Sequence, residues 1–105
     1  MHTIEWSDFE RVELRVGTLL SASINEKANK PAYLLTVDLG ELGVKTSSAQ
    51  LTAHYSTDQL IGRQVLCVCN FAPKRIAGIG SEVLVTGVYD QDGKVVLASF
   101  DHPLP

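Results

Sequence analysis

Basic and hydrogen-bonding side chains are concentrated in the middle of the chain, where their types suit contact with phosphate groups. Between residues 27 and 75, six basic residues outnumber three acidic ones, although the 105-residue chain has a formal net charge of −3. Lysine and arginine attract phosphate, and serine and asparagine donate hydrogen bonds to phosphate or sugar oxygens. The candidates of these types are Lys30, Lys45, Ser47, Ser48, Asn70, Lys74, Arg75 and Ser81. Contact with a nucleic-acid backbone is the chemistry that they would support.

The same residues also fit plainer roles. A net-acidic protein is a poor general binder of nucleic acid, and charged side chains cover the surface of any soluble protein. Ser47 and Ser48 would also suit the outward face of a strand. Asn70 would suit a turn cap, and the Lys74–Arg75 pair would suit a solvated loop. Residue types alone leave both interpretations open.

No arrangement typical of an enzyme is found. The sequence contains no G-x-S-x-G elbow, Walker loop or H-E-x-x-H helix. Ser47 or Ser48 could act as a nucleophile with His54, but no acidic residue has a defensible place beside them. We therefore expect a protein that catalyses no reaction.

Cys67 and Cys69 are the only cysteines, and they are two residues apart. On a strand, such residues lie about 6.5–7 Å apart, which is too far for an unstrained disulfide. A zinc site normally needs four ligands, and the chain has no second cysteine pair. We predict two buried thiols, and neither a metal nor a cofactor.

Apolar periodicity predicts the elements that position the candidates. Residues 7–10 have capping-box spacing, which predicts one helical turn. Alternation from Val12 to Ile24 predicts a long half-buried strand, in which Gly17 would bend the strand at a barrel corner. The residues of this strand that we expect to face the core are Val12, Leu14, Val16, Leu20, Ala22 and Ile24. The remaining predictions are strands at 33–39, 44–51, 64–71, 82–89 and 94–100, a short helix at 56–61 ending at Gly62, and a flexible loop at 72–81.

The order of these elements predicts the fold. Three strands, a short helix and two or three further strands is the order of an OB-type barrel. We therefore predict an all-β fold: a five-stranded OB-fold barrel with a short helix between strands 3 and 4 and short terminal extensions. A small sandwich is the alternative. The predicted organisation is one domain, 1–105, with residues 1–11 as an N-terminal extension and 101–105 as a C-terminal tail.

An OB barrel binds its ligands on the exposed face of strands 2 and 3 and on the loops between strands 1 and 2 and between strands 4 and 5. This topology places Lys27 and Lys30 on one loop and Lys74 and Arg75 on the other. Lys45 would lie on the face between them. The basic middle of the chain would then converge in space.

Stacking platforms for single-stranded bases are few. Tyr33 and Tyr55 are the main candidates, and the pattern places Tyr33 in the core. Sequence-specific binding of single strands depends on such platforms. Shape-based contact with structured RNA is therefore favoured.

Both ends of the chain carry apolar side chains outside the barrel pattern. Tryptophan and phenylalanine are enriched at protein interfaces, so we predict a homodimer formed through the ends. The predicted interface residues are Ile4, Trp6, Phe9, Phe100 and Leu104. Docking of the same residues on their own barrel is the alternative.

The sequence also predicts the compartment. The longest uninterrupted apolar run, residues 65–69, is far too short to span a membrane. The first residues lack the basic and apolar regions of a signal peptide. We therefore expect a cytoplasmic protein with no membrane insertion.

Six segments in order resemble the tRNA-binding-domain family of OB folds, most closely its small stand-alone bacterial branch, the CsaA-type export-related chaperones. The similarity runs from about Asp8 to the C-terminus. The segments are Asp8-Phe9 with residues 12–17, then residues 30–33, 45–51 and 60–65, then Asn70-Phe71 with Pro73-Lys74, and residues 81–84.

The resemblance implies a homodimer that binds tRNA and, in this branch, unfolded or exported polypeptides. A polypeptide would need an apolar patch, for which Phe71, Ile76 and Ile79 are the candidates. We therefore expect a non-catalytic chaperone in protein export that keeps a tRNA-binding surface. The alternative is a tRNA-binding accessory protein of translation without chaperone activity.

Overall fold

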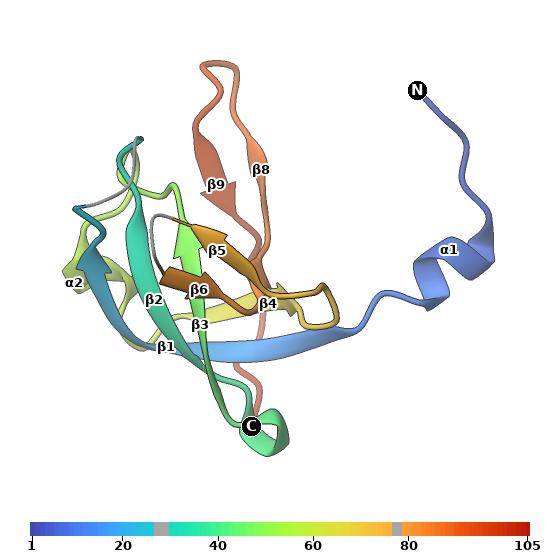
Figure 1. Ribbon diagram of the computed structural model, residues 1–105, viewed down its shortest axis with the longest axis horizontal. Coiled ribbons are helices and arrows are strands. Elements are labelled where there is room, and N and C mark those ends of the chain that lie inside the picture. Colours follow the sequence, from blue (N-terminus) through green and yellow to red (C-terminus); the bar gives the residue numbers. More distant parts are fainter. Residues whose placement is uncertain (27–29, 77–78) are drawn as a thin grey trace.

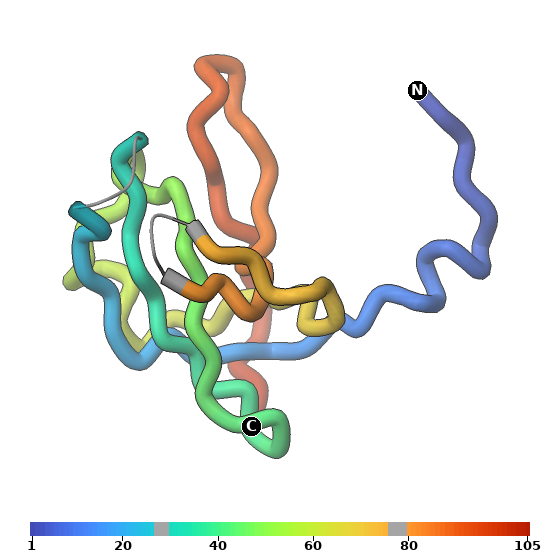
Figure 2. The backbone as a smooth tube through the Cα atoms, viewed as in Figure 1, coloured from blue at the N-terminus to red at the C-terminus, as the bar shows by residue number. Residues whose placement is uncertain are grey.

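The computed structural model describes residues 1–26, 30–76 and 79–105, with the side chains of residues 76 and 79 outside the description. The order of its elements along the chain is shown in Figure 1, and the path of the backbone in Figure 2. Lys27 lies outside the described residues, as do the side chains of Ile76 and Ile79. The predictions made for these three residues are therefore not followed further.

Five antiparallel strands form the barrel, in the spatial order β3-β2-β1-β4-β7. The strands are β1 (Leu14–Ile24), β2 (Tyr33–Asp38), β3 (Val44–Ala49), β4 (Gln64–Val68) and β7 (Leu84–Val85). The backbone N–H groups of Glu82 and Val83 donate to the Thr46 carbonyl, over 2.8 and 3.3 Å, and bring the last strand toward β3. The sheet is thereby nearly closed. The predicted five-stranded OB-type barrel is confirmed, with α2 (Thr57–Leu60) between β3 and β4.

The core follows the alternation of the sequence on β2. Tyr33, Leu35 and Val37 are buried, and the residues between them are more exposed. They pack against Val65 and Cys67 of β4. Burying each aliphatic side chain of this size contributes about 1.5–3 kcal/mol. This layer therefore fixes which face of β2 and β3 points outward.

The predicted inward face of β1 is wrong for Leu14, Leu20 and Ile24, although Ala22 packs against the core as predicted. Leu20 and Ile24 are 47% and 68% exposed, and Leu14 is also exposed, whereas Gly17 and Leu19 are buried. The register against β2 shifts between residues 19 and 21, so the irregularity falls after Gly17. A Cβ atom at Gly17 would overlap Cγ1 of Val37. Gly17 is thus needed where strand and core approach closely.

Two short helices begin at capping boxes. In α2, the Ser56 N–H donates to Oε1 of Gln59 and Ser56 Oγ accepts from the Gln59 N–H, as the sequence predicts. Gly62 follows with a φ of +85°, which favours glycine. The first helix, α1 (Trp6–Glu10), is capped by Glu5 with Asp8, two residues earlier than predicted.

Within the predicted loop 72–81, the described residues 74–76 and 79–81 form two paired strands, called the β5–β6 hairpin below. β5 (Lys74–Ile76) pairs antiparallel with β6 (Ile79–Ser81). The predicted strand 82–89 is divided into β7 and β8 (Gly87–Tyr89), and β8 pairs with β9 (Val95–Leu97). Thr86 marks the division because its N–H donates to the Leu66 carbonyl and its carbonyl accepts from the Ala98 N–H. The β8–β9 hairpin projects from the barrel (Figure 1). A short 3₁₀ turn, η1 (Gly40–Leu42), joins β2 to β3.

Candidate nucleic-acid interface

The β5–β6 hairpin lies beside β3 and is held there by polar contacts from its second strand (Figure 1). Thr46 Oγ1 donates to the Gly80 carbonyl, and the Ser48 N–H donates to Ser81 Oγ over 3.1 Å. Lys74 is paired with Ser81 across the hairpin, and Arg75 with Gly80. Both cationic side chains are exposed. The barrel thus presents two adjacent positive charges on an anchored hairpin.

A cavity of about 610 Å³ lies beside this hairpin and is lined by residues of the hairpin and of the barrel. Three of the predicted phosphate-binding residues line it: Ser48, Lys74 and Ser81. Phe71, Glu82 and Leu84 contribute to the same lining. The structure therefore brings these three candidates together, from β3, β5 and β6.

Lys45 lies on β3 opposite Val37, and its Nζ is 3.9 Å from Oε2 of Glu82. The carboxylate offsets part of the positive charge there. Lys30 is exposed in the segment that precedes β2, and it is not among the described residues that line the cavity. Neither lysine is among the described residues that line the cavity with Lys74, although Lys45 contacts Glu82 of that lining.

Ser47 must be removed from the predicted phosphate-binding set. The residue is opposite Leu35 in the β2–β3 register and is only 1% exposed. Alternate residues of a strand point to opposite faces, so Ser48 faces outward and Ser47 faces the core. Both serines were predicted to contact phosphate because the prediction considered only that both are polar.

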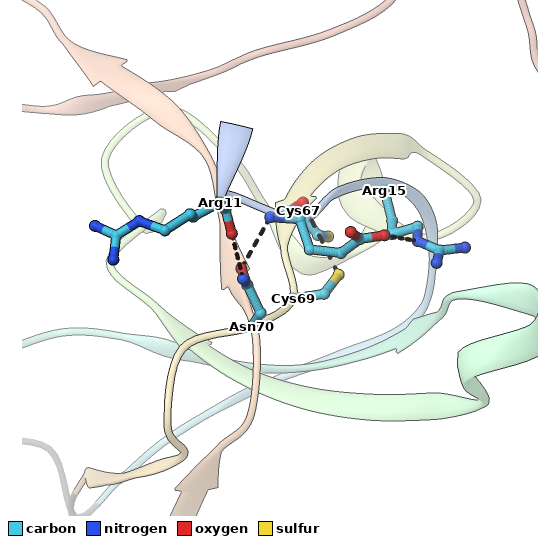
Figure 3. A network of polar contacts seen from close by, with 6 residues as sticks. Arg11, Arg15, Cys67, Cys69 and Asn70 are labelled. Carbon is cyan, nitrogen blue, oxygen red and sulfur yellow. Dashed lines mark hydrogen bonds and ion pairs between the residues drawn. The ribbon is translucent and has the colours of Figure 1, made fainter. Parts of the chain in front are cut away.

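The amide of Asn70 holds the N-terminal segment. Its Oδ1 accepts from the Glu13 N–H over 2.9 Å, and its Nδ2 donates to the Arg11 carbonyl over 2.6 Å. The Cys69 N–H donates to the Glu13 carbonyl as well. Figure 3 shows the Asn70 side chain reaching toward Arg11. The Asn70 side chain thus bonds the N-terminal segment and not the turn that follows it, and its contact with phosphate stays a prediction.

The two tyrosines are structural rather than exposed platforms. Tyr33 Oη donates to the Tyr55 carbonyl over 2.8 Å, and Tyr55 Oη accepts from the Leu97 N–H over 3.0 Å. The Arg63 guanidinium lies 5.0 Å from the centre of the Tyr55 ring. Phe71, by contrast, is 58% exposed. The exposed ring that lines this cavity is therefore that of Phe71, which the sequence assigned only to an apolar patch.

The two cysteines are free thiols; Cys67 is buried, as predicted, whereas Cys69 is only half-buried. Burial, followed by the neighbouring Cys69, raises the pKa of Cys67 to about 12. Burial also raises the pKa of Cys69 above its usual value. Both therefore stay protonated at neutral pH, where a thiol is a poor nucleophile. No group of three or more possible metal-ligating side chains occurs among residues 1–26, 30–76 and 79–105.

His54 pairs with Asp90 at the far end of β8, with 2.7 Å between Nε2 and Oδ2. No hydrogen bond within the described part of the chain joins His54 to Ser47 or Ser48. The burial of Ser47 removes it from any substrate. The structure therefore does not support the hypothesis that Ser47 or Ser48 acts as a nucleophile with His54.

The two ends of the chain differ. The first residues lead away from the barrel, and Trp6 is 72% exposed (Figure 2). Its ring lies 5.7 Å from that of Phe9, centre to centre, and Ile4 is exposed too. The C-terminal tail docks on β4, where Gln64 bonds both the N–H and the carbonyl of Leu104 over 2.9 and 2.6 Å.

The remaining predicted interface residue, Phe100, is half-buried. The C-terminal tail thus docks on its own barrel, as the alternative prediction had it, and the N-terminal segment does not. Within the described residues, no helix is long and apolar enough to cross a membrane.

Comparison with known proteins gives a consistent result. A family model described as a putative tRNA binding domain matches residues 14–105. The structure of the chaperone CsaA from Bacillus anthracis superposes with a TM-score of 0.93 at 45% identity, covering 99% of this chain and 94% of that one. CsaA from Picrophilus torridus gives 0.91 at 42% identity, covering 98% and 95%.

A larger protein matches as well. The methionine–tRNA ligase of Flavobacterium johnsoniae is 31% identical over 102 residues. These residues are 97% of this chain but 14% of that enzyme. The chain therefore spans a small part of the curated relative that it matches.

Proposed function

This chain belongs to the putative tRNA-binding-domain family, close to CsaA, and we propose that it binds tRNA without catalysing a reaction. The observation that carries the proposal is the anchored hairpin with exposed Lys74 and Arg75. Cationic side chains of this kind contact phosphates and fix a protein on a nucleic acid. Ser48 and Ser81 lie in the same cavity and add polar groups beside the charges.

The proposal includes chaperone activity toward unfolded or exported polypeptides in the cytoplasm. The two similar solved structures are chaperones named CsaA, and their matches cover nearly the whole of this chain. The side chains of Phe71 and Leu84 are exposed and give an apolar surface that a polypeptide would contact. Exposed apolar patches of this kind are typical of binding sites.

A second function is favoured by the match to a methionine–tRNA ligase. That enzyme contains this domain as 14% of its length. A stand-alone copy would then hold tRNA for the translation machinery as an accessory protein without chaperone activity. Suppression of aggregation of an unfolded client by the protein would favour the chaperone, and its absence alongside tRNA binding would favour the accessory protein.

A homodimer is also part of the proposal. Ile4, Trp6 and Phe9 are exposed on a segment that leaves its own barrel. Apolar aromatic side chains are costly to leave in water, and a second copy of the chain would bury them. We expect light scattering at micromolar concentration to give twice the chain mass of 11.4 kDa.

A titration of labelled tRNA at several salt concentrations tests the proposal. The Lys74→Ala/Arg75→Ala variant should bind more weakly and lower the salt slope by about two, because each phosphate contact releases about one counterion. The control variant, Lys94→Ala/Arg11→Ala, removes the same two residue types from outside the hairpin and should keep the slope of the native chain. Failure of the native protein to bind tRNA at low salt would refute the function.

A further inference from the structure

The cavity beside the β5–β6 hairpin is lined partly by apolar side chains, and phosphate binding would not require them. Phe71, Val83 and Leu84 give it an apolar lining, and Lys74 and Glu82 line it too. A volume of about 610 Å³ is in the range of sites that hold small planar ligands. The exposed ring of Phe71 is suited to stacking on a nucleobase, since every base has an aromatic face.

Glu82 is fixed in this cavity by the barrel. Its Oε1 accepts a hydrogen bond from the Thr46 N–H over 3.1 Å. Thr46 Oγ1 also lies 3.1 Å from this oxygen, but its single hydrogen is donated to the Gly80 carbonyl. The Glu82 Oε2 atom lies 3.9 Å from Lys45 Nζ. A carboxylate has about four lone-pair sites, so the bond from the Thr46 N–H leaves acceptor capacity on both oxygens for a ligand. A donor that enters the cavity would therefore meet a carboxylate whose position is already set.

We propose that this cavity binds one unpaired guanine of an RNA, a proposal that rests on the proposed tRNA binding. Guanine carries two neighbouring donors on its pairing edge, N1–H and N2–H, which match a carboxylate. Adenine, cytosine and uracil each place an acceptor next to a donor there, so the carboxylate would face a lone pair. Phe71 stacks on the base, Glu82 accepts from its edge, and Lys74 and Arg75 contact the flanking phosphates.

Charge favours RNA over an apolar polypeptide as the occupant. Lys74 lines the cavity and Arg75 follows it on β5, and neither forms an ion pair with any residue that the structure describes. An apolar side chain in the cavity would take the Lys74 ammonium group out of water without an anionic partner, which is costly. RNA loops offer unstacked bases that proteins read by stacking and by their pairing edges.

The test compares two short oligouridines that differ only in one central guanine or adenine. By fluorescence anisotropy, the guanine oligomer should bind at least about tenfold more tightly, the discrimination typical of a well-matched base contact. Glu82→Gln should abolish this preference, because its carbonyl still accepts from Thr46 while its amide now presents a donor. Glu41→Gln makes the same charge change on η1, outside the cavity lining, and should keep the preference.

Phe71→Ala should weaken both oligomers about tenfold, the loss expected for one stacked base, without changing the salt slope. Equal binding of the two oligomers by the native protein would overturn the guanine site. So would a Glu82→Gln variant that retains the preference.

The guanine site and the proposed function can fail separately. If tRNA binds through Lys74 and Arg75 while Glu82→Gln and Phe71→Ala bind as the native protein does, the function stands and the guanine site falls. NMR titration with GMP and AMP probes the cavity without tRNA. GMP-selective shifts at the amides of Phe71 and Glu82 support the site. Shifts caused there by an apolar peptide and not by GMP overturn it in favour of a polypeptide occupant.

Discussion

The β5–β6 hairpin and the N-terminal segment are both attached to the barrel by a few polar contacts, and they differ in direction and in chemistry. The hairpin lies along β3, where Thr46 and Ser48 bond to it, and it presents Lys74 and Arg75. The N-terminal segment is held at one point by Asn70 and then leaves the barrel. It presents apolar rings. We infer that the first region serves RNA and the second a further copy of the chain.

The comparison also separates two uses of polar side chains. Asn70 and Lys74 are four residues apart, and both were candidates for phosphate contact. The Asn70 amide is satisfied by backbone groups of the N-terminal segment, whereas Lys74 is exposed. Polar side chains that are hydrogen-bonded to the backbone position segments of the chain, whereas exposed charged side chains are available to bind another molecule.

The largest effect is expected from removing the rings of the N-terminal segment. Trp6→Ala/Phe9→Ala should weaken dimerisation about a hundredfold or more, since burying each ring contributes at least about 1.5 kcal/mol. Sedimentation equilibrium measures the change. Tyr89→Ala removes an equally exposed ring from β8 and should leave the dimer intact. A native chain that sediments as a monomer, or a variant that dimerises normally, would contradict the comparison.

A smaller effect is expected from Asn70→Ala. Two hydrogen bonds are lost, which should weaken the attachment of the N-terminal segment by about 1–3 kcal/mol. Hydrogen exchange at the Glu13 amide should accelerate, and dimerisation should weaken. Binding of tRNA at saturating protein concentration should not change in salt slope, because no phosphate contact is lost. A lower slope would show that Asn70 contacts phosphate.

The sequence predicted the barrel because its evidence is local and periodic. Alternation on β2 and the capping box of α2 each depend on neighbouring residues, and both are confirmed. The face of β1 was predicted only in part, because the register shift after Leu19 depends on pairing with β2 and leaves no mark in the sequence. Gly17 was correctly singled out, but close packing against Val37 is its reason.

The candidate site was predicted in part for the same reason. Lys74 and Ser81 could be grouped because the topology of an OB barrel brings their segment to one surface. The burial of Ser47 depends on which alternate residues of β3 face the core, and the mostly polar sequence of this strand does not indicate that. The roles of Asn70 and Glu82 depend on partners 57 and 36 residues away, which no local pattern indicates.

A weaker effect on the hairpin is expected from Thr46→Val. The variant keeps the side-chain shape and loses the hydrogen bond that Thr46 Oγ1 donates to the Gly80 carbonyl. The loss should destabilise the attachment of β6 by about 0.5–1.5 kcal/mol. Faster hydrogen exchange at the amides of Ser81 and Glu82, with unchanged dimerisation, is the expected result. Loss of dimerisation would show that the two regions are not independent.

The smallest effect concerns pH and the β8–β9 hairpin. The Lys94 N–H first, and then His54, lower the pKa of Asp90 below its usual value of 3.8. A carboxyl with a lowered pKa in the folded state stabilises the fold above its unfolded pKa, and this contribution is lost as pH falls through the folded pKa. Amide protection in this hairpin should therefore fall below pH 3.8. Asp90→Asn should remove that pH dependence, and an unchanged profile would rule out the pair as its source.

The central claim is that RNA and the second copy of the chain use different regions. The most direct test is to add tRNA to the isotope-labelled dimer and follow the backbone amide signals. The account predicts changes at Ser48, Lys74, Arg75 and Ser81, with the signals of Trp6 and Phe9 unaffected. Changes confined to the N-terminal segment, with the hairpin signals unmoved, would contradict it.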